Sequence, residues 1–78
     1  MDVRQFDSLD YTRKTEAILK GTFLATRVAA GYFVKLYNVD YFYVEVYFHN
    51  RSQLITRFRA FDQTALVLPY LGELKIAV

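Results

Sequence analysis

The segment YFYVEVYFH, residues 41–49, alternates strictly between two kinds of side chain. Because successive residues of a strand point to opposite faces of a sheet, one face of this segment is wholly apolar. The other face carries tyrosines together with Glu45 and His49. One apolar face and one partly polar face are typical of a central strand in an antiparallel sheet. The segment therefore limits the chain to folds that contain such a sheet.

The length and composition of the chain point to self-association. At 78 residues the chain forms one domain, and a domain of this size buries about 60 to 65% of the surface that its unfolded form exposes. Small domains compensate for a thin core with disulfides, a structural metal or self-association. The chain has no cysteine and one histidine, His49, so we expect neither disulfides nor a metal site, and no cofactor. Self-association is the source of stability that is left.

Charge and hydropathy bear on location and partners. Residues 1–19 mix charges throughout, and no uncharged run approaches the ~20 residues of a membrane-spanning helix. We therefore expect no membrane association and a cytoplasmic location. The formal net charge of +2 is too small to predict a polyanionic partner by itself. The excess of basic over acidic residues lies between residues 21 and 61.

The N-terminal third is predicted to contain one helix. Residues 1–7 show no hydrophobic period and are expected to be a loosely held end, so that the folded domain covers residues 8–78. Asp10, or Ser8 before it, is a suitable N-cap for a helix that continues up to Gly21. The glycine would end this helix in the left-handed conformation.

From Thr22 the hydrophobic period changes to two, which predicts four antiparallel strands. Facing residues of an antiparallel pair share one face, so the numbers of paired residues must add to an even value if apolar faces are to match. This condition excludes two-residue loops. The predicted three-residue loops are 29–31, 38–40 and 50–52. In this register Glu45 faces Arg57, and Tyr43 faces Arg59.

The predicted fold class is α+β, with the order α-β-β-β-β-α. The strands form a four-stranded antiparallel meander, and both helices pack on one face. The residues of that face are Leu24, Val34, Val44 and Phe58.

The C-terminal part allows two predictions. Asp62 or Thr64 could begin a second helix, but Pro69 would then remove a backbone hydrogen bond within it. The alternative is a turn from Asp62 to Leu68, followed by a helix with Pro69 at its first position. Residues 75–78 remain unassigned.

No residue pattern predicts catalysis. His49 could be a general base, but no carboxylate of the predicted register lies beside it, and a polar residue that closes a hairpin is the simpler interpretation. Glu45 between two tyrosines could be a general acid with a raised pKa, or it could form an ion pair with Arg57 across the strands. We favour the ion pair. We expect no catalytic, cofactor-binding or metal-binding residues and no enzyme activity.

The face opposite the predicted helices mixes aromatic and cationic side chains. The interface or ligand face is predicted to consist of Phe33, Lys35, Tyr37, Tyr41, Tyr43, Glu45, Tyr47, Ile55, Arg57 and Arg59. Such a composition is typical of protein interfaces and also of surfaces on which single-stranded nucleic acids stack. Because the basic excess is small, we favour a small interaction or structural domain that forms a homodimer or binds a protein partner. A module that binds single-stranded nucleic acid through the same face is the alternative, and a small apolar ligand is a further one.

In topology, a helix, an antiparallel meander and a closing helix resemble double-stranded-RNA-binding domains. That family has three strands and a lysine cluster at the start of its last helix, whereas the corresponding residues here are Asp62, Gln63, Thr64 and Ala65. The binding residues of that family therefore have no counterparts in this chain. The strands with the following helix also resemble the single-strand-binding domains of Pur-alpha and Whirly proteins, again without a shared motif.

Overall fold

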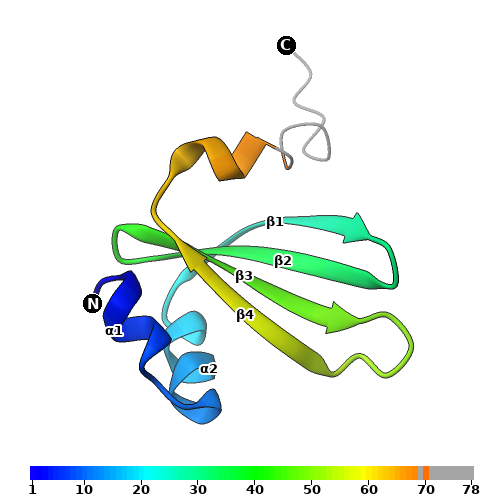
Figure 1. Ribbon diagram of the computed structural model, residues 1–78, viewed down its shortest axis with the longest axis horizontal. Helices are drawn as coiled ribbons and strands as arrows, with labels where there is room; N and C mark the ends of the chain where they lie inside the picture. Colours follow the sequence, from blue (N-terminus) through cyan, green and yellow to red (C-terminus); the bar gives the residue numbers. More distant parts are fainter. Residues whose placement is uncertain (69, 71–78) are drawn as a thin grey trace.

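Two short helices precede a four-stranded antiparallel sheet in the computed structural model, which describes residues 1–68 and Tyr70. The elements are α1 (Val3–Asp7), α2 (Tyr11–Leu19), β1 (Thr22–Ala29), β2 (Tyr32–Val39), β3 (Phe42–His49), β4 (Ile55–Phe61) and the 3-10 helix η1 (Thr64–Val67). The strands pair in the order β1-β2-β3-β4 (Figure 1). The predicted α+β class and the antiparallel meander are therefore confirmed.

The N-terminal residues form α1 instead of the loosely held end that we expected. The Asp2 side chain accepts a hydrogen bond of 2.9 Å from the Gln5 N–H, and the Gln5 side chain accepts one of 2.8 Å from the Asp2 N–H. This reciprocal pair is a capping box. Phe6 is fully buried and packs edge-on against Phe42 and Phe58. A helix this short shows no hydrophobic period because Phe6 alone of its residues is buried.

Helix α2 agrees with the prediction at its start and differs at its end. The Asp10 side chain accepts a hydrogen bond of 2.9 Å from the Arg13 N–H, as an N-cap does. Lys20 closes the helix in a right-handed conformation, with φ −86°. Gly21 serves close packing instead, because a Cβ atom there would lie 2.5 Å from the Asn38 carbonyl oxygen.

The registers of the first two hairpins differ from the prediction. Strands β1 and β2 are joined by a two-residue turn at 30–31, and β2 and β3 by another at 40–41. Gly31 and Asp40 take the positive φ values, 77° and 52°. A two-residue turn inverts the face of β2 relative to the predicted register. The predicted three-residue loops at 29–31 and 38–40 are therefore wrong.

From Arg57 onward the third hairpin keeps the predicted faces but not the predicted pairs, and Ile55 before it changes face. Glu45 lies opposite Arg59, and Tyr47 lies opposite Arg57. The turn spans residues 50–53 instead of 50–52, because the backbone N–H of His49 donates a hydrogen bond to the carbonyl of Leu54. Residues 57–61 of β4 are therefore shifted by two positions from their predicted partners, and Ile55 is shifted by one.

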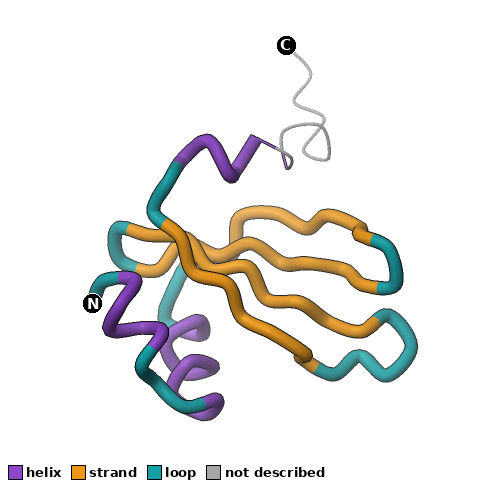
Figure 2. Tube along the Cα trace, in the orientation of Figure 1, coloured by secondary structure: helices purple, strands orange, loops and turns teal. Residues whose placement is uncertain are grey.

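Both faces of the sheet are covered in part, so that the helices do not all lie on one face. Helices α1 and α2 pack on the helix face, whose buried core is Phe6, Ile18, Val39, Phe42, Val44 and Val46. The opposite face, called the Glu45 face below, has a second core of Ala25, Leu36, Phe61 and Tyr70. Figure 2 shows the N-terminal helices and η1 on different sides of the strands.

Two residues of the predicted helix face lie elsewhere. Val34 is fully buried, and it shares the Glu45 face because it pairs with Tyr47. Leu24 lies at a register shift in β1 and has no strand partner. Val44 and Phe58 do lie on the helix face.

The C-terminal segment is a 3-10 helix at the position where a turn or a second helix was predicted. Leu66 and Val67 pack against the core of the Glu45 face. Pro69 and residues 71–78 lie outside the described residues, and so do the predictions made for them. Within the described part of the chain, no helix is long and apolar enough to cross a membrane.

Candidate functional site

Among the described residues, Glu45 is the one charged side chain that is buried, with 2% of its surface exposed. Its Oε1 accepts a hydrogen bond of 3.1 Å from Nη1 of Arg59, and its Oε2 accepts one of 3.0 Å from Nη2 of Arg27. The arginines come from β4 and β1, so the ion pairs connect three strands. A buried carboxylate requires such partners, since its desolvation is otherwise uncompensated.

Two tyrosine hydroxyls complete the surroundings of this carboxylate. The Tyr70 hydroxyl donates a hydrogen bond of 2.6 Å to Oε2 of Glu45, and the Tyr47 hydroxyl donates one of 3.3 Å to Oε1. Burial, and then the hydrogen bond to Glu45, raise the pKa of Tyr70 above its usual value of about 10. The Tyr70 hydroxyl therefore keeps its proton at neutral pH and remains a donor.

Arg27 connects the ion pairs to the aromatic rings. Its burial acts to lower the pKa, but the hydrogen bonds to Glu45 and Tyr70 oppose this, and the pKa of Arg27 is raised on balance. The guanidinium lies 5.4 Å from the ring centroid of Tyr70 and 6.0 Å from that of Tyr47. We call Arg27, Glu45, Tyr47, Arg59 and Tyr70 the Glu45 cluster. Its geometry joins the C-terminal segment to the sheet.

The structure divides the ten residues of the predicted interface between two faces. Those on the Glu45 face are Tyr43, Glu45, Tyr47, Arg57 and Arg59. Those on the helix face are Phe33, Lys35, Tyr37 and Ile55. Tyr41 lies in the β2–β3 turn and is 97% exposed. The division follows from the two-residue turns, which invert β2, and from the register shift before Phe48, which inverts Ile55.

Sequence reasoning missed Tyr70, which covers part of the Glu45 face and is itself fully buried. The available signal was an aromatic residue four positions after the apolar Leu66, but its contact with Glu45 spans 25 positions of the chain. Because Tyr70 lies on this face, the face is not the open aromatic surface on which we based the expected dimer.

On the helix face, strand pairing aligns four apolar residues in one row. Val28 pairs with Phe33, Phe33 pairs with Phe48, and Phe48 pairs with Ile55. Val28 is 77% exposed, and the other three are half-buried. The rings of Phe33 and Phe48 stack with their centroids 5.7 Å apart. We call these four residues the apolar row. It lies near the β1–β2 and β3–β4 turns, which Figure 1 shows at the end of the sheet away from α1, and its Phe48 and Ile55 extend to a pocket beside α2.

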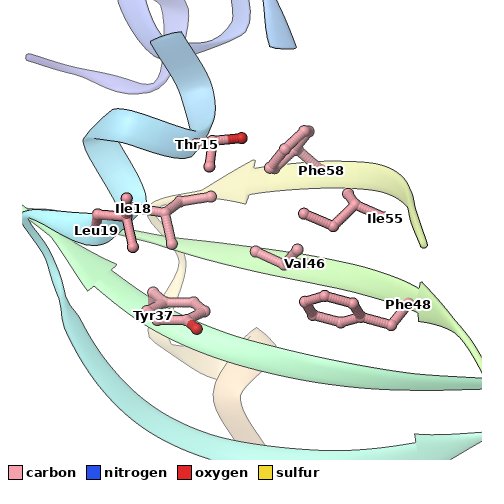
Figure 3. A pocket seen from close by; sticks show the side chains of 8 residues that line it. All are labelled: Thr15, Ile18, Leu19, Tyr37, Val46, Phe48, Ile55 and Phe58. Atoms are coloured by element: carbon pink, nitrogen blue, oxygen red, sulfur yellow. The ribbon is translucent and has the colours of Figure 1, made fainter. Parts of the chain in front are cut away.

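A pocket of about 150 Å³ lies between α2 and the sheet, next to the apolar row. Figure 3 shows its lining, which consists of Thr15, Ile18, Leu19, Tyr37, Val46, Phe48, Ile55 and Phe58. The Thr15 hydroxyl donates to the carbonyl of Tyr11 at 3.0 Å. The pocket is therefore an almost entirely apolar space.

His49 takes part in a turn. Its Nδ1 accepts hydrogen bonds from the backbone N–H groups of Arg51, at 3.3 Å, and Ser52, at 3.4 Å. Its ring packs edge-on against Tyr32. These contacts match the simpler interpretation of His49 as a residue that closes a hairpin.

Comparison with known proteins gives no significant match to a family model, to a curated protein or to a solved structure.

Proposed function

We propose that this protein is a small non-enzymatic interaction domain that self-associates through the apolar row. The observation that supports this proposal is the continuity of the row, because one large apolar residue from each of the four strands lies on one face. A partly exposed apolar stripe of this kind is typical of interaction surfaces in soluble proteins. A row also suits a two-fold contact, in which the same patch of two copies meets itself.

The apolar row is a better candidate than the Glu45 face. On the Glu45 face, the carboxylate and the Tyr70 hydroxyl already bind one another within the chain. A partner on that face would have to displace Tyr70, which is fully buried. A partner on the helix face would bury Val28, whose side chain is apolar and 77% exposed, without breaking a hydrogen bond.

Light scattering after size-exclusion chromatography tests the proposal. We expect twice the chain mass of 9.2 kDa at tens of micromolar protein. Val28→Asp should give the monomer, because a charge in the contact would be buried without a partner. Tyr41→Asp is the matched control, since Tyr41 is 97% exposed in a turn outside the row, and it should leave the dimer intact. A wild-type monomer at several hundred micromolar would contradict the proposal.

Binding of single-stranded nucleic acid is the second candidate, and one observation favours it. The guanidinium of Arg57 lies 4.9 Å from the ring centroid of Tyr47 and outside the Glu45 cluster. An exposed arginine on an aromatic ring can contact a phosphate while a base stacks nearby. Fluorescence anisotropy with mixed-sequence oligonucleotides in ~50 mM salt tests it, because phosphate contacts are little screened there. We expect no binding. A salt-dependent signal that Arg57→Ala weakens would support the second candidate instead.

A further inference from the structure

The pocket beneath α2 has an apolar floor and an open rim. Ile18 is 6% exposed and Val46 is 2% exposed, whereas Leu19 at the rim is 79% exposed. Figure 3 shows Ile18 and Leu19 on the α2 side of the space, with Val46 and Phe48 across from them on β3. A pocket of about 150 Å³ accepts a ring or a short chain of about six carbon atoms.

Two lysine ammonium groups lie beside this pocket. Nζ of Lys35 is 5.2 Å from the ring centroid of Phe48, and Nζ of Lys14 is 5.7 Å from that of Phe58. Both rings line the pocket. Neither lysine forms an ion pair within residues 1–68 and Tyr70, and the described lining contains no acidic residue. The pocket thus combines an apolar interior with positive charge at its edge.

We infer that this pocket binds a small amphipathic carboxylate, with the aliphatic tail in the pocket and the carboxylate beside Lys35. Lys35 is the residue opposite Val46 on the neighbouring strand, and its ammonium lies over the ring of Phe48, which lines the pocket. The ammonium of Lys14 already lies over two rings, those of Phe6 and Phe58. Its contribution is mainly to the positive electrostatic potential at the pocket. This inference goes beyond self-association, and the pocket shares Phe48 and Ile55 with the apolar row.

The charge of the head group distinguishes this site from a nonspecific apolar pocket. A tail alone gains free energy from the removal of apolar surface from water, whatever its head group. An anionic head group gains further from the two ammonium groups, and a cationic one is repelled by them. The site should therefore rank three ligands of equal tail length in the order carboxylate, alcohol, ammonium.

Titration of the ¹⁵N- and methyl-labelled protein with hexanoate, 1-hexanol and hexylammonium, followed by NMR, tests this order. We expect hexanoate to bind most tightly and to shift the signals of Ile18, Val46 and Ile55. Lys35→Gln should weaken hexanoate binding about fivefold and leave the affinity for 1-hexanol unchanged. Lys20→Gln is the matched control, since Lys20 lines a different pocket, with Ala17 and Asp40, whereas the ammonium of Lys35 lies over the Phe48 ring of this one. This substitution should leave the affinity for hexanoate unchanged.

A second variant tests the location of the tail. Thr15→Leu fills part of the pocket and removes only the hydroxyl that binds the Tyr11 carbonyl. It should abolish hexanoate binding while the amide spectrum stays dispersed. Equal affinities for the three ligands, or no shifts with hexanoate in the folded wild-type protein, would overturn the inference. Light scattering with and without hexanoate keeps this result separate from self-association, because it measures the mass of the protein independently of the ligand-induced NMR shifts.

Discussion

The two faces of the sheet bury the same strand, β3, by different physical means. On the helix face, Val44 and Val46 are covered by aromatic and aliphatic side chains of α1, α2 and β4. On the other face, Glu45 is covered by two guanidinium groups and two phenol hydroxyls. Apolar burial has no preferred direction, whereas each hydrogen bond and ion pair requires a particular partner. The comparison shows that one strand can be buried by non-directional apolar contacts on one side and by directional polar contacts on the other.

The difference predicts how each face responds to solution conditions. Contacts among apolar groups do not change with protonation, so the stability from the helix face should be independent of pH and of moderate salt. The Glu45 face depends on one negative charge, two positive charges and two tyrosine protons. Its contribution should therefore change with pH where Tyr70 titrates.

The largest effect is expected for Phe6→Ala on the helix face. Removal of a fully buried phenylalanine destabilises a domain by about 3 kcal/mol or more. Urea unfolding followed by circular dichroism should show this loss equally at pH 6 and pH 9. Phe23→Ala is the control, because that ring is 52% exposed and should contribute much less. A loss that differs between the two pH values would contradict the apolar account of this face.

The next effect is expected for Glu45→Gln on the opposite face. The substitution preserves shape but leaves Arg27 and Arg59 without their counter-charge, which should lower the free energy of unfolding by about 2 kcal/mol. The same unfolding experiment measures it. Glu16→Gln, an exposed carboxylate on α2, should change stability by less than about 0.5 kcal/mol. Equal effects of the two substitutions would show that the Glu45 cluster does not form.

The smallest effect is expected for Tyr70→Phe, which removes one hydroxyl. The loss should be about 1.5 kcal/mol, because the hydrogen bond ends on a charged acceptor. The pKa of Tyr70 is raised in the folded state, so its contribution is complete below the unfolded value of about 10 and is lost as the pH rises above it. The difference in stability between wild type and Tyr70→Phe should therefore shrink above pH 10. A difference that stays constant up to pH 11 would contradict this assignment.

Helix α2 and the four strands could be predicted from the sequence, but α1 and the strand registers could not. The Asp10 cap and the period of two after Thr22 were sufficient for α2, the four strands and the α+β class. The registers were wrong because the parity rule assumed one buried face. Val34 and Leu36 were matched to the apolar face of β3, yet they are buried on the opposite side.

For the candidate site, local patterns identified Glu45 but not all of its partners. An arginine opposite Glu45 was predicted, but it is Arg59 rather than Arg57, because one more residue in the turn shifts β4. The contact of Tyr70 with Glu45 could not be predicted, since the position of Tyr70 depends on how η1 follows β4 and not on any local hydrophobic period. The apolar row also depends on the true registers, because Val28 and Phe33 share a face with Phe48 only in the observed pairing.

The contact between Glu45 and Tyr70 can be tested most directly by a double-mutant cycle. Unfolding free energies of Glu45→Gln, Tyr70→Phe and the double variant give the coupling between the two side chains. The 2.6 Å hydrogen bond predicts a coupling of about 1 kcal/mol or more. The pair Glu45→Gln and Tyr41→Phe, whose side chains do not meet, should be additive. Additivity of Glu45→Gln and Tyr70→Phe to within about 0.3 kcal/mol would show that the C-terminal segment does not bind the Glu45 face.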